Sequence, residues 1–133
     1  MPVPVKTIIK PRGLIDGLGG PVRSGMAIVL ESERILAIDR QSDISVLEHE
    51  SQVLEYPEST VLPGLIDCHT HTNMPGSGLS VDEISEDDDY LHLLTAVRNA
   101  RLALENGVTT IRDNGGWNDV PFALKKGISN KII

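Results

Sequence analysis

The alternation of apolar and polar positions changes its character near the middle of the chain. Over the first sixty residues the apolar runs are short and β-branched, and turns containing Gly and Pro separate them. The runs are residues 5–9, 26–30, 34–39, 52–56 and 60–62. This pattern predicts short strands, with a hairpin between the second and third runs. We expect this part of the chain to form a small antiparallel sheet.

From Pro63 onward the period of the pattern switches from about 2 to about 3.6 residues. A strand pattern at Leu65–His71 precedes a helical pattern that begins near Asp87 and stops at Asn106-Gly107. A second strand at 108–112 and a short helix at 120–126 follow. The order strand, helix, strand, helix predicts a parallel α/β layer.

One stripe of the long helix is apolar and is expected to pack against the strands around Leu65 and Val108. The stripe consists of Tyr90, Leu93, Leu94, Val97, Ala100 and Leu104.

Composition and charge exclude several classes of partner. The chain has 19 acidic and 12 basic residues, a formal net charge of -7, and therefore no footprint for binding nucleic acid or an anionic membrane. A single cysteine, Cys68, cannot form an internal disulfide and indicates a reducing compartment. No apolar run approaches the ~18 residues of a membrane span. We expect a soluble, cytoplasmic protein.

Two histidines are the candidate metal ligands. His69 and His71 are two residues apart, a spacing that places both imidazoles on the same face of a strand, and imidazole is the commonest ligand for zinc-like ions. Asp67 shares this parity and could support a ligand from one step deeper. Spacing alone does not separate such a pair from two surface histidines at a strand end, because zinc usually takes three or four protein ligands.

The other reactive side chains have simpler interpretations. Asp113 ends the second strand, where it could support the metal site or bond its own backbone in a turn. Cys68 has the opposite parity and is expected in the core. His49 and His92 are interpreted as surface or partly buried residues. The acidic residues within 82–89 are expected to cap a helix rather than bind calcium.

The residues around the histidine pair resemble a known family. Val61–His71, which reads VLPGLIDCHTH, resembles nearly residue for residue the sequence that opens the barrel of the amidohydrolase superfamily of metal-dependent hydrolases. Residues 7–62 resemble the small β-sandwich that precedes this barrel. Residues 107–113 are similar to its second strand in the imidazolonepropionase-like and prolidase-like dipeptidase branch. The resemblance covers essentially the whole chain.

The resemblance implies an α/β fold in two parts. Residues 1–62 would be an amino-terminal β-sandwich portion, and residues 63–133 the first two β/α units of a TIM-type amidohydrolase barrel. That barrel would be incomplete, since a whole one takes roughly 250 residues. His69 and His71 would bind a divalent metal ion, zinc above all, with one or two ions in a complete enzyme. The remaining ligands and the general base would come from later strands, so no catalytic residue is assigned.

The implied activity is hydrolysis of a carbon–nitrogen bond by metal-activated water. The substrate would be a small amide, cyclic amide or dipeptide, whose identity this segment does not encode. The chain alone is expected to be inactive, and a complementing chain or a homo-oligomer could provide what is missing. The alternative is a non-catalytic product, either truncated or retained as an assembly or interaction fragment.

Overall fold

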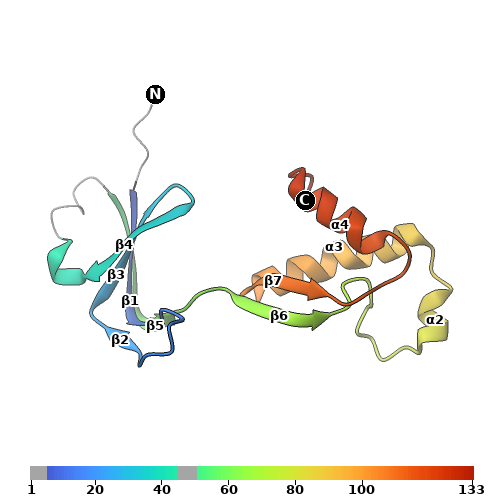
Figure 1. Cartoon of the computed structure of the whole chain (residues 1–133), viewed down its shortest axis with the longest axis horizontal. Helices are drawn as coiled ribbons and strands as arrows, with labels where there is room; N and C mark the ends of the chain where they lie inside the picture. Colours follow the sequence, from blue (N-terminus) through green and yellow to red (C-terminus); the bar gives the residue numbers. More distant parts are fainter. Residues whose placement is uncertain (1–5, 45–50) are drawn as a thin grey trace. The chain divides into compact units, whose positions relative to one another are not determined.

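The computed structural model describes residues 6–44 and 51–133 and has a mixed α/β architecture with two separate sheets (Figure 1). The chain divides into two compact units, Met1–Pro63 and Gly64–Ile133, which we call the amino-terminal and carboxyl-terminal units. The expected mixture of strands and helices is confirmed. The assignments of a β-sandwich portion and of a barrel beginning at residue 63 stay predictions.

The amino-terminal unit is built on one five-stranded sheet. Its central strands β1 and β3 are antiparallel neighbours, β4 pairs with β3, and β2 and β5 pair with β1. The predicted hairpin is confirmed, because β3 and β4 run antiparallel with Glu31 opposite Arg34. The elements are β1 Lys6–Leu14, β2 Arg23–Ser24, β3 Met26–Glu31, β4 Arg34–Arg40, the 3-10 helix η1 Gln41–Asp43 and β5 Ser51–Val61.

The prediction of a small antiparallel sheet is confirmed for the pairings among β1, β2, β3 and β4 and is wrong for β5. Strand β5 runs parallel to β1, with Lys6 opposite Ser51 and Leu14 opposite Val61. The two runs at 52–56 and 60–62 are parts of this one strand. A parallel pair needs a connection longer than a hairpin turn, and the chain between β1 and β5 provides it.

Apolar side chains cover both faces of the central strands. On one face Ile8, Ala27, Val29 and Ile44 form a buried cluster. On the other, Leu14, Met26 and Ile28 are buried, with partly buried side chains around them. Successive residues of β3 therefore enter different clusters, as the alternation of a strand requires.

The carboxyl-terminal unit has the predicted order of strand, helix, strand and helix. Strand β6 Leu65–Thr70 is parallel to β7 Val108–Asp113, and they lie side by side (Figure 1). Helices α2 Val81–Ser85 and α3 Asp89–Glu105 connect them, and α4 Val120–Ser129 follows. Helix α2 was not predicted. No helix in the described ranges is long and apolar enough to cross a membrane.

The buried face of α3 differs from the predicted stripe. Tyr90, Leu94 and Leu104 are 81%, 66% and 63% exposed, whereas His92 and Ala96 are buried. The cause is the position of α4, whose Val120 and Leu124 form a cluster with Ala96 and with the partly buried Leu93, Val97 and Ala100. Contact with α4, together with the strands, selects which side of α3 is covered.

Candidate functional site

His69 and His71 lie together where β6 ends. His69 is an exposed residue of β6. His71 is the first residue after the strand and is partly buried. The centroids of the two imidazole rings are 5.3 Å apart, and the ring planes meet at 68°. The spacing of two residues thus brings both rings to one place at the carboxyl end of β6, as the strand pattern predicted.

The ring of His71 is oriented by the loop that follows β7. Its Nδ1 lies 2.7 Å from the carbonyl oxygen of Gly115. A carbonyl oxygen only accepts, so Nδ1 carries the proton and donates it to this bond. In the neutral ring Nε2 is then left with a free lone pair, the arrangement typical of a histidine that binds metal.

The two candidate supporting carboxylates contact backbone rather than imidazole. Asp67 Oδ1 accepts from the backbone N–H of His69 at 3.0 Å. Asp113 accepts from the backbone N–H of Thr72 at 3.2 Å, from the Thr72 hydroxyl, and from the N–H of Gly115 at 3.0 Å. The bond to Gly115 is the expected turn bond. Through Thr72, Asp113 also ties the loop after β6 to the end of β7.

The donor set fits part of a metal site. Two imidazoles lie side by side, and the hydrogen bond to Gly115 leaves Nε2 of His71 available to a metal ion. Within residues 6–44 and 51–133, however, no group of three or more His, Cys, Asp or Glu side chains could hold an ion. Because zinc usually has three or four protein ligands, the pair accounts for only two positions of such a site.

Several residues near the pair were not identified from the sequence. Asn99 of α3 donates from Nδ2 to the carbonyls of Thr72 at 2.9 Å and Met74 at 2.8 Å, which fixes the loop after His71. The interpretation of His92 as a surface or partly buried residue was wrong, because its side chain is 2% exposed and its ring stacks on that of Trp117 at 5.0 Å with 13° between the planes. His92 and Asn99 are four and three residues from the buried Ala96, so they share its side of α3. This spacing could have identified them, but a search for apolar side chains overlooks polar residues.

Two other predictions concern Cys68 and His49. Cys68 was expected in the core but is exposed, because β6 is little covered on either face: all of its residues from 65 to 69 are exposed. His49 lies outside the described residues.

His71 lines two hollows of the carboxyl-terminal unit. One, of about 370 Å³, is formed by His71, Met74 and residues 115–118. The other, of about 240 Å³, lies between the loop after β6 and α3 and includes Asp67, His71 and Asn99. His71 therefore borders two open hollows, and His69 is among the lining residues of neither.

Two of the acidic residues within 82–89 act in helix caps, which is the role that the sequence predicted for this segment. Asp88 Oδ1 accepts from the N–H of Leu91 at 2.9 Å and begins α3. Ser80 and Glu83 form a reciprocal capping box on α2. Hydrogen bonds from the hydroxyl and then from the backbone N–H of Ser80 hold the pKa of Glu83 below its ordinary value of 4.5.

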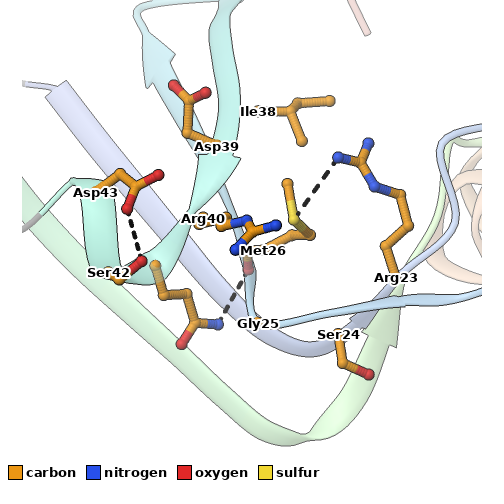
Figure 2. A pocket seen from close by; sticks show the side chains of 10 residues that line it. Arg23, Ser24, Gly25, Met26, Ile38, Asp39, Arg40, Ser42 and Asp43 are labelled. Carbon is orange, nitrogen blue, oxygen red and sulfur yellow. Dashed lines mark hydrogen bonds between the residues drawn. The ribbon is translucent and has the colours of Figure 1, made fainter.

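The amino-terminal unit has an open hollow of about 750 Å³ between β2, β3, β4 and η1 (Figure 2). Its polar groups hold the unit together. Arg23 pairs with Asp16 at 3.4 Å and points toward the sulfur of Met26, and Gln41 donates to the carbonyls of Pro11 and Met26. Mixed charges line this hollow, and no histidine is among the lining residues, so it is a weaker candidate for catalysis.

Comparison with known proteins gives relatives that share this fold. No family model matches the chain. An imidazolonepropionase from Pseudomonas syringae pv. tomato (strain ATCC BAA-871 / DC3000) is 31% identical over an alignment covering 68% of this chain and 28% of that protein. The structure of phenylurea hydrolase B is 27% identical, with a TM-score of 0.77, over 96% of this chain and 28% of that one.

A third similarity concerns the fold alone. A Xaa-Pro dipeptidase structure with bound methionine in its active site is 24% identical to this chain, with a TM-score of 0.77. The similarity covers 96% of this chain and 31% of the dipeptidase. The chain thus spans less than a third of the length of each of these three proteins.

Proposed function

Because the chain belongs to the amidohydrolase superfamily, we propose that it is the amino-terminal part of a metal-dependent hydrolase of carbon–nitrogen bonds. In this proposal His69 and His71 bind a divalent metal ion, for which zinc is the first choice. The observation that carries the proposal is the pairing of the two rings at the end of β6, with His71 Nδ1 bonded to the Gly115 carbonyl.

The roles of this chain's residues follow from their positions. His69 and His71 would each provide a ring nitrogen to the ion, and Asp67 and Asp113 would hold the backbone around them. When bound, a divalent ion supplies Lewis acidity that polarises a carbonyl and activates water near neutral pH. No described residue is placed to act as the general base, so further ligands and the base would come from sequence beyond this segment or from a complementing chain.

The substrate we propose is a small amide, cyclic amide or dipeptide, in keeping with relatives described as an imidazolonepropionase and a Xaa-Pro dipeptidase. The hollows beside His71 are of a size for such molecules or parts of them. The net charge of -7 favours a small-molecule substrate over nucleic acid.

A second candidate function is supported by the exposure of the carboxyl-terminal strands. Leu65 and Ile66 of β6 are 50% and 66% exposed, although apolar strands of a parallel sheet are normally covered on both faces. A non-catalytic assembly or interaction fragment would use this surface to bind a complementing chain or a second copy of itself.

Zinc binding to the whole 133-residue chain tests the first function. We expect a chromophoric chelator competition to show binding that weakens at least ~10-fold in the His69→Ala, His71→Ala double variant. Cys68→Ser, on the opposite parity of the same strand, is the matched control and should bind as the parent does. Equal affinity of parent and double variant would refute the assignment of the ligands.

Turnover separates a complete from a partial site. Since the residues that the structure describes provide two candidate ligands and no general base, the chain with added zinc or manganese should not hydrolyse dipeptides or cyclic amides above background. Turnover that disappears in His69→Ala would show that the chain completes its own active site.

A further inference from the structure

In the loop after β7, the backbone N–H and the backbone carbonyl of one residue, Gly115, contact two different partners. The N–H of Gly115 donates to Asp113 Oδ1 at 3.0 Å, and its carbonyl accepts from His71 Nδ1 at 2.7 Å. Gly115 has φ +128°, a conformation that residues with a side chain rarely adopt. The orientation of the His71 ring therefore depends on how firmly this glycine is held.

Glycine itself contributes no side chain to hold the loop. The next residue, Gly116, lies against the buried side chain of Asn73, and a Cβ on Gly116 would clash with that amide. The amide of Asn73 makes no hydrogen bond within the described parts of the chain, so its contact with Gly116 is one of packing. Packing alone restricts a Gly-Gly segment only weakly, because glycine has the greatest backbone freedom.

Trp117 is the first side chain after the two glycines, and it is anchored. Its ring stacks on His92 of α3 with 5.0 Å between centroids. His92 is 2% exposed, and its Nε2 has no hydrogen-bond partner among the residues that the structure describes. No hydrogen bond at Nε2 therefore accounts for the burial of this imidazole. The contact that the structure shows for the ring is the stack on Trp117.

A neighbouring bond ties the same loop to the same helix. Asn118 Nδ2 donates to Asp89 Oδ1, in the first turn of α3, at 2.8 Å. Trp117 and Asn118 thus attach the segment 115–118 to α3, while His71 and Asp113 attach it to the strand ends.

We propose that Trp117, stacked on the buried His92, is a positioning residue that keeps the Gly115 carbonyl on His71 Nδ1 and so leaves Nε2 free for the metal. This inference rests on the proposed function for the role of the free Nε2. The stack would act on His71 through the loop, since an indole ring provides no ligand to a metal ion. Losing it would release the Gly-Gly segment, let the His71 ring rotate, and mix its two tautomers.

The tautomer of His71 can be measured without any metal. Long-range proton–nitrogen spectra of the labelled chain, recorded at about pH 8.5 where a free imidazole is neutral, distinguish Nδ1–H from Nε2–H rings. We expect the parent to show the Nδ1–H form at His71, assigned by its absence in His71→Gln. Trp117→Leu and His92→Leu should both show a mixture, and Trp117→Phe and His92→Phe should restore the Nδ1–H form.

Phe122→Leu is the matched control, because it removes an aromatic ring that is 71% exposed and outside the stack. It should leave the tautomer unchanged. An Nε2–H or mixed His71 in the parent, or an unchanged tautomer in folded Trp117→Leu, would overturn the proposal. Should Trp117→Leu fail to fold, the parent and the His92→Phe and His92→Leu pair still decide the outcome.

Zinc affinity, measured separately, distinguishes failure of this inference from failure of the proposed function. If both hold, Trp117→Leu should weaken zinc binding about 10-fold, the lower end of the usual effect of residues that orient ligands. A fixed Nδ1–H tautomer without zinc binding in the parent would refute the metal site and leave the positioning role standing. Zinc binding by the parent that is unchanged in Trp117→Leu would refute the positioning role alone.

Discussion

The two units of this chain use apolar strand residues in opposite ways. In the amino-terminal unit, four successive residues of β3 are buried, and clusters cover both faces of the central strands. In the carboxyl-terminal unit, five of the six residues of β6 are exposed, and the buried cluster lies between α3 and α4. The first unit buries the apolar residues of its central strand β3, whereas the second leaves those of its strand β6 exposed.

The difference matters for function because the candidate site is in the less covered unit. His69 and His71 lie at the end of the exposed strand β6, and their local support comes from two loops and α3. Strands of a closed barrel gain stability only when neighbouring strands and helices cover them. We interpret the carboxyl-terminal unit as a part that needs further structure, and the amino-terminal unit as one that contains its own core.

The largest effect should come from a matched pair of isoleucines. Ile8 in β1 is 0% exposed and Ile66 in β6 is 66% exposed. We expect Ile8→Ala to lower the free energy of unfolding by about 2–5 kcal/mol, through lost burial and a cavity. Ile66→Ala should change it by less than ~0.5 kcal/mol. Urea denaturation of both variants measures the contrast, and equal losses would show that β6 is covered in solution.

Removing Asp113 should have the next largest effect. Its carboxylate accepts from the backbone and hydroxyl of Thr72, which is 3% exposed, so Asp113→Ala would leave buried donors without a partner. A loss of about 2 kcal/mol in unfolding free energy is expected. The exposed Asp87, changed to Ala, is the control and should cost little. A negligible loss for Asp113→Ala would show that the Thr72 bond is absent in solution.

The uncovered strand should also cause self-association. Sedimentation across a concentration series should detect oligomers of the parent chain, because an apolar strand surface is open to a second copy. Ile66→Lys should raise the dissociation constant at least ~10-fold, equivalent to about 1.4 kcal/mol. Ile35→Lys in β4 changes a residue of similar exposure, 62%, in the other unit and should have no such effect. A parent chain that stays monomeric would contradict the comparison.

The smallest effect concerns α2 and pH. The pKa of Glu83 is lowered by the hydroxyl and backbone of Ser80, so its ionised form stabilises the folded helix. This contribution is fully present above the ordinary pKa of 4.5 and is lost as the pH falls through the lower, folded value. Amide exchange of residues 81–85 should therefore quicken in acid. The exchange rates are corrected for their intrinsic pH dependence. In Glu83→Gln they should not rise further in acid, and a rise equal to that of the parent would reject the capping box.

Local features of the fold were predictable, and pairings over long separations were not. Strands β3, β4 and β7 follow from short β-branched runs, and the stop of α3 follows from Asn106-Gly107. The parallel pairing of β5 with β1 could not be predicted, since periodicity does not specify a strand's partner. The buried side of α3 depends on α4, so the exposed Tyr90 and Leu94 were placed on the wrong face.

The candidate site shows the same division. Two histidines at a spacing of two could be identified from the sequence, because a strand turns that spacing into proximity. Their supporting groups are distant: the Gly115 carbonyl is 44 residues from His71. His92 and Trp117 meet only because α3 packs beside the loop after β7, so no local pattern indicates their stack.

The central claim is that the carboxyl-terminal unit brings two metal ligands and not a complete set. X-ray absorption spectroscopy of the zinc-loaded chain tests this most directly, because it counts imidazole, oxygen and sulfur donors around the ion. The account predicts two imidazoles at about 2.0–2.1 Å, with oxygen in the remaining positions. It also predicts that the imidazole signal disappears in the His69→Ala, His71→Ala variant. A sulfur ligand from Cys68, or an imidazole signal that survives in the double variant, would contradict it.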